Sequence, residues 1–303
     1  MSPTSGDLEI LPKSTNVKSN NNTIGDQDLT IIKDWLKKQP HLPDKWENSC
    51  LRAFLQGCSY SLEKTKRKLD MYFTMRAACP EFFTNRDITR PEMMDLMVRA
   101  QQPTMPGLTE DGKRISIVRG LTKDLETHNL IECYKIKLMI ADVRMIEETK
   151  VIVGDVYIFD ADILSANHLK NLPSILGTVK KFLICAQEAY PVKLKEVHVI
   201  NISPLVEIVY NVMKPLLKDK IRNRVYFHKD CTGLLKFIPK DMLPSEYGGT
   251  GISLAEAQAS WVEKLKEYGP WFKEQESIKA DEALRPGKPT NYDELFGMDG
   301  SFK

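Results

Sequence analysis

The sequence predicts an α/β protein in which a helical N-terminal domain is followed by an α/β domain with a mostly parallel sheet and a lid-like helix. Three observations predict this fold class. Amphipathic helical segments follow one another between residues 26 and 101, whereas strand-like and helical segments alternate from about residue 113. The third observation is a helical segment, residues 203–224, that carries apolar side chains around most of its circumference.

The N-terminal helical domain is assigned to residues 26–101, after a disordered N-terminus at residues 1–25 that is rich in Ser, Thr and Asn. Apolar side chains recur at helical spacing in three segments: Leu29, Ile32, Trp35 and Leu36; Leu51, Phe54 and Leu55; and Leu62, Leu69, Tyr72 and Phe73. The third helix begins with a basic run that includes Lys64 and Arg67. Because the dipole at a helix start favours acidic residues, this run indicates a partner rather than helix stabilisation.

The α/β domain is assigned to residues 102–252. Its predicted strands are residues 114–119, 151–160, 197–200 and 224–227, and its predicted helices are residues 125–148, 168–188 and 205–218. Residues 151–160 are almost continuously apolar, which predicts a strand buried on both faces. A C-terminal helix is expected within residues 253–284, and residues 285–303 are expected to form a flexible tail.

The composition is that of a globular protein, since 42% of the 303 residues are hydrophobic, 28% are charged and the net charge is +2. So small a net charge does not by itself imply nucleic-acid binding. The six cysteines form no C-x-x-C pair, which predicts buried, reduced thiols rather than a metal site. The N-terminus lacks a signal-peptide pattern, and no apolar run reaches the roughly 18 residues of a membrane span. We therefore expect a cytoplasmic protein that meets membrane surfaces transiently.

The sequence predicts that the protein is not an enzyme, because it contains no catalytic motif. Neither a G-x-S-x-G elbow nor a G-x-x-x-x-G-K-[ST] loop is present. Residues 247–251 imitate a dinucleotide loop, but a plain turn before a helix N-cap at Ser253 is favoured, because no strand precedes them. Asp160 and Asp162 follow a predicted strand without a nucleophile nearby in sequence. The histidines are isolated, so we expect no metal and no cofactor.

Residues 203–224 have the composition of a lid. One polar stripe at helical spacing consists of Glu207, Asn211, Lys214 and Lys218. The rest of the circumference is apolar, so the helix must meet apolar material on a second side. Pro215 predicts a kink or break, and a basic cluster follows it. A lid that opens at an anionic membrane and a wholly buried core helix both fit this pattern.

Apolar stripes on several predicted elements are typical of a lipid or vitamin cavity. The residues assigned to its lining are Tyr134, Leu138, Ala141, Met145, Tyr157, Phe159, Phe182, Cys185, Val197 and Val199. The residues of the lid that would face it are Val206, Val209, Tyr210 and Met213. A solid core would produce the same stripes, and this alternative stays open.

Basic residues outnumber acidic residues by ten to four between positions 193 and 240, which predicts a basic surface on a nearly neutral protein. Its members are Lys193, Lys195, Lys220, Arg222 and Arg224, with Arg67 as a further candidate. Each such charge contributes on the order of 1 kcal/mol near an anionic membrane, and Arg binds phosphate through two hydrogen bonds. An ordinary solvated surface is the alternative.

Five segments together resemble the CRAL-TRIO lipid-transfer family, in particular its branch of α-tocopherol transfer protein and retinaldehyde-binding protein in an insect-like form. They are FLQGCSYSLEKTKRKLDMYFTMRAACPEFF (54–83), VYIFDAD (156–162), AYPVKLKEVHVIN (189–201), MKPLLKDKIRNRVYFH (213–228) and LPSEYGG (243–249). The resemblance covers about residues 26–275 and rests on the combination of the segments. Gln56, Gly57 and Cys58 depart from the basic residues that are common in the family, and Asp155 interrupts its apolar strand.

The resemblance implies a carrier that binds a small hydrophobic lipid, such as a tocopherol, retinoid or carotenoid, and moves it between membranes without a covalent reaction. It implies a gate helix at about residues 205–224 and phosphoinositide binding by Lys193, Lys220 and Arg224, and less closely by Arg67. Arg222 is added to this phosphoinositide site because it belongs to the same basic run. The expected partners are the lipid, phosphoinositides and anionic membrane surfaces, but no nucleic acid, and the protein is expected to be monomeric. A phosphoinositide-binding recruitment module that transfers no lipid is the alternative.

Overall fold

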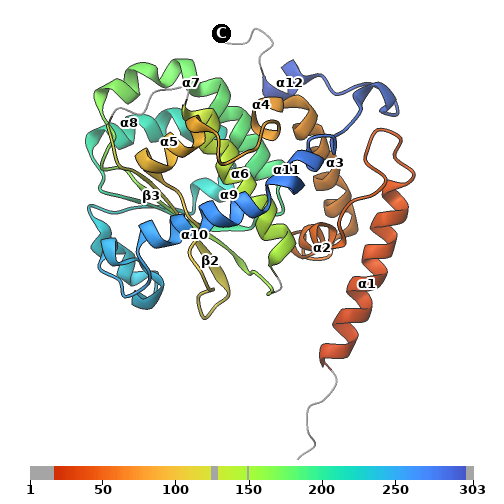
Figure 1. Cartoon of the computed structure of the whole chain (residues 1–303), viewed down its shortest axis with the longest axis horizontal. Helices are drawn as coiled ribbons and strands as arrows, with labels where there is room; N and C mark the ends of the chain where they lie inside the picture. The colour runs from red at the N-terminus through yellow and green to blue at the C-terminus, as the bar shows by residue number, and fades with distance from the viewer. Residues whose placement is uncertain (1–16, 124–128, 149, 298–303) are drawn as a thin grey trace, which may run out of the picture.

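The computed structural model describes residues 17–123, 129–148 and 150–297, and it shows a helical block beside a sheet that is covered by further helices (Figure 1). The helices of the N-terminal block are α1 (Val17–Leu36), α2 (Asn48–Gly57), α3 (Leu62–Ala78), α4 (Pro80–Phe83) and α5 (Pro91–Arg99). Those that follow are α6 (Asn129–Glu147), α7 (Ala166–Ile184), α8 (Pro204–Met213), α9 (Asp219–Arg222), α10 (Leu254–Glu267), α11 (Gly269–Gln275) and α12 (Tyr292–Phe296). None of the helices in the described ranges is long and apolar enough to cross a membrane.

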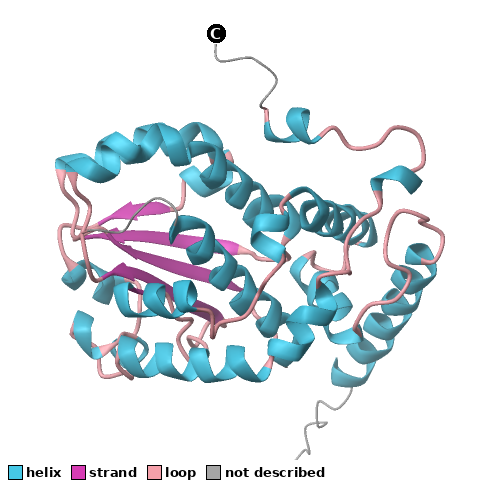
Figure 2. Ribbon diagram, turned by 45° about the horizontal axis from the view of Figure 1, so that its top comes forward, coloured by secondary structure: helices cyan, strands magenta, loops and turns pink. Residues whose placement is uncertain are grey.

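The described residues form a five-stranded sheet of order β1-β2-β3-β4-β5. Its strands are β1 (Ala100–Gln101), β2 (Lys113–Gly120), β3 (Gly154–Asp160), β4 (Leu194–Ile200) and β5 (Val225–Phe227). Only the short β1 is antiparallel to its neighbour, whereas β2 to β5 are parallel. The predicted fold class, a helical N-terminal domain before a mostly parallel α/β domain, is therefore confirmed (Figure 2).

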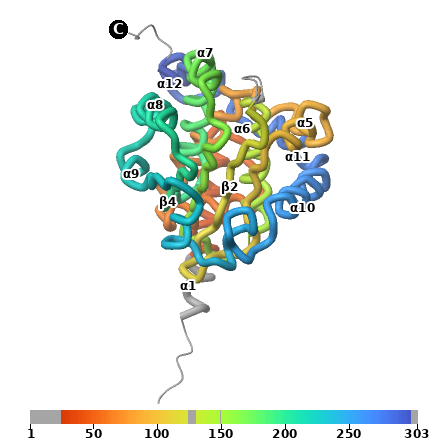
Figure 3. Tube along the Cα trace, turned by 90° about the vertical axis from the view of Figure 1, so that its left-hand side faces the viewer, coloured from red at the N-terminus to blue at the C-terminus, as the bar shows by residue number. Residues whose placement is uncertain are grey.

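The order of the parallel strands places their connecting helices on one face of the sheet. Each strand from β2 to β5 pairs with the next one along the chain, and right-handed connections that always advance in the same direction lie on the same face. The helices α6, α7, α8 and α9 make these connections. The opposite face packs against α10 and the chain that precedes it, and its core includes Ile117, Ile158, Leu234 and Leu254. Figure 3 shows α8 and α9 on one side of the molecule and α10 on the other.

A buried charged cluster joins the helical block to the α/β domain. The carboxylate of Asp142 in α6 accepts hydrogen bonds from the hydroxyls of Tyr72 (3.1 Å) and Tyr190 (2.7 Å) and from Nη1 of Arg86 (2.6 Å). The guanidinium of Arg76 lies 3.5 Å from the same carboxylate. All five side chains are buried. The carboxylate of Asp142 therefore fixes three parts of the chain to α6: helix α3, the loop before α5 and the segment before β4.

Proline residues end two helices earlier than the sequence pattern predicts. The lid-like helix stops at Met213 and continues only as a short 3₁₀ turn, Lys214–Leu216, which contains Pro215. The single helix expected within residues 253–284 is two helices, because Pro270 in the first turn of α11 has no N–H with which to continue the hydrogen bonding of α10. Strand β3 also begins at Gly154 rather than at residue 151.

The ends of the described chain are more ordered than the sequence predicts. Helix α1 begins at Val17, within the N-terminus that was expected to be disordered, while residues 1–16 lie outside the described ranges. Instead of a flexible tail, the chain after residue 284 packs on the helical block: Arg285 donates hydrogen bonds to Asp70 and Glu282, and Phe296 of α12 is buried. The contacts of Arg285 with Asp70 and of Phe296 with Lys181 join segments far apart in sequence, which composition does not reveal.

Candidate functional site

One face of the sheet carries a row of incompletely covered apolar side chains. The register of the parallel strands pairs Val118 with Phe159, Phe159 with Val199, and Val199 with Phe227, so the four side chains lie in line across β2, β3, β4 and β5. Phe159 is 40% exposed and Phe227 is 41% exposed. We name these four residues the apolar row. On the opposite face the neighbouring Ile117 and Ile158 are fully buried, so the two faces of the sheet differ in packing.

Helix α8 lies beside the end of the apolar row. The ring of Tyr210 meets the ring of Phe227 edge to face, with centroids 5.0 Å apart. Val206 is buried, whereas Val209, Tyr210 and Met213 are half-buried. Ile208 is 50% exposed and Val212 is 36% exposed on the outer side of the helix. The alternative of a wholly buried core helix is therefore wrong, and the second apolar side of α8 faces solvent rather than a second apolar layer.

The structure divides the predicted cavity lining into two groups. Tyr157, Phe159, Val197 and Val199 lie on the strand face that carries the apolar row. The other six side chains pack with the N-terminal helices in the core of the helical block: Tyr134, Leu138, Ala141, Met145, Phe182 and Cys185. The rings of Tyr134 and Phe182, for example, stack at 4.0 Å. Helix α6 is apolar on both of its sides, so periodicity could not show that this stripe faces α2, α3 and α4 instead of the sheet.

The strand β3 is fully buried on one face and only partly covered on the other, which corrects the prediction that it is buried on both. Val156 and Ile158 are fully buried beneath α10 and the chain before it. On the other face Tyr157 is half-buried and its ring stacks on Phe159, at a centroid distance of 6.1 Å. An uninterrupted apolar sequence predicts two apolar faces but not whether protein atoms cover both of them.

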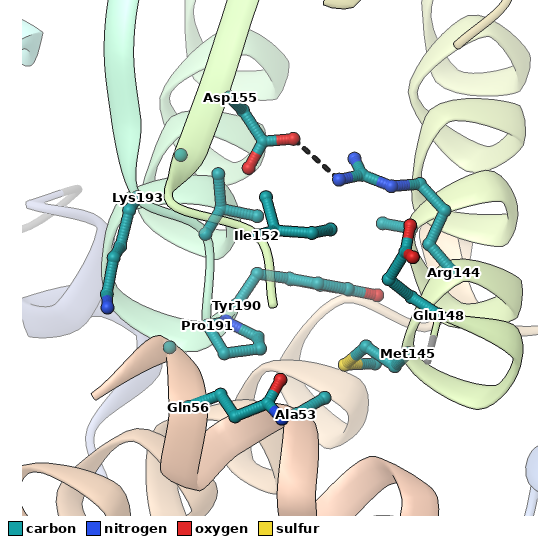
Figure 4. Close-up of a pocket in the computed structure, with 14 residues that line it drawn as sticks. Ala53, Gln56, Arg144, Met145, Glu148, Ile152, Asp155, Tyr190, Pro191 and Lys193 are labelled. Atoms are coloured by element: carbon teal, nitrogen blue, oxygen red, sulfur yellow. Dashed lines mark hydrogen bonds and ion pairs between the residues drawn. The ribbon is translucent and has the colours of Figure 1, made fainter. Parts of the chain in front are cut away.

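A pocket of about 80 Å³ lies at the junction of the two domains, away from the apolar row (Figure 4). It is lined by α2, α6 and the segments that lead into β3 and β4, and Lys193 stands at its edge. The carboxylate of Asp155, the residue that interrupts the apolar sequence of β3, forms a 2.6 Å ion pair with Arg144 of α6. This acid therefore fixes α6 to β3.

The predicted basic surface includes a meeting point of three segments. Lys68 in the first turns of α3 donates hydrogen bonds to the carbonyl oxygens of Gln187, Glu188 and Tyr190, at 3.2, 3.3 and 2.6 Å. Burial lowers the pKa of Lys68 to about 8, and repulsion by the positive charges of Lys218 and Lys220 adds to this effect. Burial and the neighbouring Lys195 likewise lower the pKa of Lys193. Lys68, a member of the basic run predicted at the start of this helix, is thus the residue that connects the basic segments.

The basic residues differ in how they are used within the fold. Arg224 donates a hydrogen bond to the carbonyl of Leu194, and Arg222 pairs with Asp219 one helical turn away. By contrast, the side chains of Arg67, Lys193 and Lys220 have no hydrogen-bond or ion-pair partner among the described residues. These three form what we name the free basic set. Arg67 and Lys220 are exposed and Lys193 is half-buried, so they are the cations best placed to meet an anion.

The residues that resembled catalytic or nucleotide-binding motifs have structural partners. The carboxylate of Asp160 accepts hydrogen bonds from the amide of Asn201 (2.7 Å) and the hydroxyl of Tyr247 (2.9 Å). A Cβ on Gly249 would lie 1.9 Å from the carbonyl oxygen of Leu243, so the turn before α10 requires glycine there. Ser253 caps α10 by accepting a hydrogen bond from the backbone of Glu256. Within the described ranges, no cluster of three or more His, Cys, Asp or Glu side chains is arranged to hold a metal.

Comparison with known proteins matches both domains. Residues 21–93 match the Pinta-like UBA domain, and residues 103–249 match the CRAL/TRIO domain. The alpha-tocopherol transfer protein-like protein of Homo sapiens is 26% identical over 234 residues, which are 76% of this chain and 67% of that protein. Clavesin-1 of Xenopus laevis is 26% identical over 231 residues, which are 74% of this chain and 68% of the relative.

A solved structure shows the same fold. The crystal structure of Sfh5 superposes with a TM-score of 0.54 at 13% identity, over 84% of this chain and 98% of that one. The parallel sheet, the open face beside α8 and the two domain matches agree with the resemblance that the five sequence segments indicated. Residues 103–249 therefore form a domain of the CRAL-TRIO family, and the relatives that share it are lipid-binding transfer proteins and not enzymes.

Proposed function

We propose that this protein carries a small, mostly apolar lipid of the tocopherol, retinoid or carotenoid type between membranes in the cytoplasm. The observation that carries the proposal is the apolar row: Val118, Phe159, Val199 and Phe227 are aligned across four strands, yet no helix covers them fully. Two half-exposed phenylalanines on one sheet face lose stabilisation at roughly 25 cal/mol per Å² of apolar surface left in water. A bound lipid would recover that stabilisation.

Helix α8 is proposed as the gate to this site. Its inner side meets the apolar row through the contact between Tyr210 and Phe227, and its outer side exposes Ile208 and Val212. The 3₁₀ turn at Pro215 interrupts the helical hydrogen bonding between α8 and α9, so α8 can move without carrying α9 with it. An outer apolar side on such a helix fits contact with a membrane while the inner side releases the lipid.

The free basic set is proposed to bind the phosphates of phosphoinositides during docking. Arg67, Lys193 and Lys220 come from three segments that meet around Lys68, and none of them is neutralised by a neighbouring acid within the described residues. Arg222 and Arg224 lie close to Lys220 in sequence and would add positive charge near the bound phosphates. Their bonds to Asp219 and to the carbonyl of Leu194 fix the conformation of this segment. The relatives named for α-tocopherol transfer support a lipid cargo, and we propose that this chain acts as a monomer.

Mass spectrometry of the organic extract tests the carrier function. We expect protein purified without detergent and incubated with a tissue lysate to retain one enriched lipid at about one molecule per chain, since a single continuous apolar row offers one site. Protein from which no lipid can be extracted, whatever the source, would contradict the carrier proposal. It would favour a module that binds phosphoinositides and recruits other proteins without transferring lipid.

Charge reversal tests the docking role separately. The triple variant Arg67→Glu, Lys193→Glu and Lys220→Glu is expected to slow lipid transfer to vesicles containing phosphoinositides by about tenfold or more, since each charge contributes on the order of 1 kcal/mol at an anionic surface. Equilibrium lipid binding should not change, because these side chains lie away from the apolar row. Reversal of the exposed Lys37, Lys45 and Lys273 is the matched control. Equal slowing by both variants would contradict a specific docking surface.

A further inference from the structure

Lys137 is a buried amine that has no role in the apolar row, the gate or the basic surface. It lies on α6, where its side chain is almost completely buried, and its Nζ donates one hydrogen bond, to the carbonyl oxygen of Gln102 at 2.9 Å. No carboxylate within the described ranges forms an ion pair with it, because the nearby Asp155 is paired with Arg144. A buried lysine without an acidic partner is costly, so its retention in the core requires an explanation.

The surroundings of Lys137 can stabilise an anion. Burial lowers the pKa of Lys137 to about 7, and the positive charge of Arg144 lowers it further. The Cys133 thiol and the Asp155 carboxylate raise it, but by less. The side-chain amide of Gln102 is also buried, and its Nε2 has no hydrogen-bond partner. The thiol of Cys133 donates to the oxygen of the same amide, at 3.3 Å, which fixes the orientation of that amide. Two buried donors, Nζ of Lys137 and Nε2 of Gln102, therefore have unused hydrogen-bonding capacity within one cluster.

This cluster adjoins the apolar row. Nζ of Lys137 lies 5.4 Å from the centre of the Tyr157 ring, a cation–π distance. Tyr157 stacks in turn on Phe159, the exposed member of the row on β3. The open apolar face thus leads from Phe159 through Tyr157 to a buried amine, so a lipid on that face would place one end at Lys137.

We propose that Lys137 receives the carboxylate of an acidic lipid whose hydrocarbon tail covers the apolar row. An alcohol or ester would leave the protonated form of Lys137 without a counter-charge, whereas a carboxylate favours that form, supplies the missing acid and accepts hydrogen bonds from Lys137 and Gln102 together. Because hydrogen bonds to a charged group are stronger than those to a neutral one, we expect a preference of about tenfold or more for the acid. The inference rests on the proposed lipid-carrier function and narrows its ligand to lipids that end in a carboxylate, which excludes tocopherols and carotenoids.

The test compares two lipids with the same tail, oleic acid and oleyl alcohol, in equilibrium binding to the full chain at neutral pH. The unmodified protein should bind oleic acid about tenfold more tightly or better. Lys137→Met, which keeps the length of the side chain but not its charge, should remove this preference by weakening acid binding alone. Lys137→Arg should retain the preference. Lys135→Met is the matched control, because Lys135 is also buried on α6 but pairs with Glu132, and it should leave the preference unchanged.

Different failures have different meanings in this experiment. If both lipids bind with equal affinity, or if Lys137→Met weakens both to the same extent, the carboxylate site is refuted while the carrier function stands. If neither lipid binds and the organic extract is also empty, the carrier function itself is refuted. Thermal unfolding of each variant shows whether it is folded, and a folded Lys137→Gln replaces Lys137→Met if the latter is not.

Discussion

Replacing Asp142 with alanine is expected to lower the free energy of unfolding by roughly 3–5 kcal/mol, the largest stability effect that we predict for any single acidic residue. The carboxylate is the shared partner of two buried guanidinium groups, Arg76 and Arg86, and of two buried hydroxyls. Its removal leaves two positive charges without a counter-charge inside the protein. Chemical denaturation monitored by circular dichroism measures the change.

The control for this variant is Asp162→Ala, because Asp162 is exposed. It is expected to change the free energy of unfolding by no more than about 0.5 kcal/mol. Two atoms of Arg86, Nε and Nη2, already lack partners in the folded protein. Adding Arg86→Met to Asp142→Ala should therefore restore part of the lost stability, since it removes one of the two uncompensated charges. A loss below about 1 kcal/mol for Asp142→Ala would show that water reaches the cluster and that the two domains are joined by other contacts.

Replacing Phe159 with glutamate is expected to abolish lipid binding while leaving the protein folded. The side chain lies in the middle of the apolar row on a central strand, where a carboxylate would face the hydrocarbon of the ligand and lose its hydration. Because Phe159 is already 40% exposed without ligand, the free energy of unfolding should fall by only about 1 kcal/mol. Lipid extraction and equilibrium binding measure the first effect, and denaturation measures the second.

Tyr226→Glu is the matched control for Phe159→Glu. Tyr226 is 37% exposed, but it precedes Phe227 on β5 and therefore points to the opposite face of the sheet. We expect this variant to bind lipid normally. If Phe159→Glu also binds lipid with normal affinity, the ligand does not lie on the apolar row. The pocket at the junction of the two domains, beside Lys193, is then the candidate binding site.

The local pattern predicted most elements but not the places where they end. Alternating apolar residues correctly placed β2 near residues 114–119, and helical spacing correctly placed α2, α3, α6 and α7. The predicted C-terminal ends of α8 and α10 lie several residues beyond the observed ends at Met213 and Glu267, although the sequence contains Pro215 and Pro270. The ordered contacts of Arg285 and Phe296 were missed altogether, because their partners lie in α3 and α7, more than a hundred residues away.

The sequence by itself determined the fold class, the family and the residues from which a lipid site and a basic surface can be built. These follow from hydrophobic periodicity, the order of elements and local motifs, all of which are properties of neighbouring residues. Only the tertiary structure decided which side of each apolar element is packed against other parts of the protein. It placed Tyr134, Leu138 and Met145 in a packed core and left Phe159 uncovered, and it paired Arg222 and Arg224 but not Lys220. The physical reason is that burial and charge pairing depend on which distant segments meet, and an apolar or basic side chain looks the same in sequence whichever neighbour it receives.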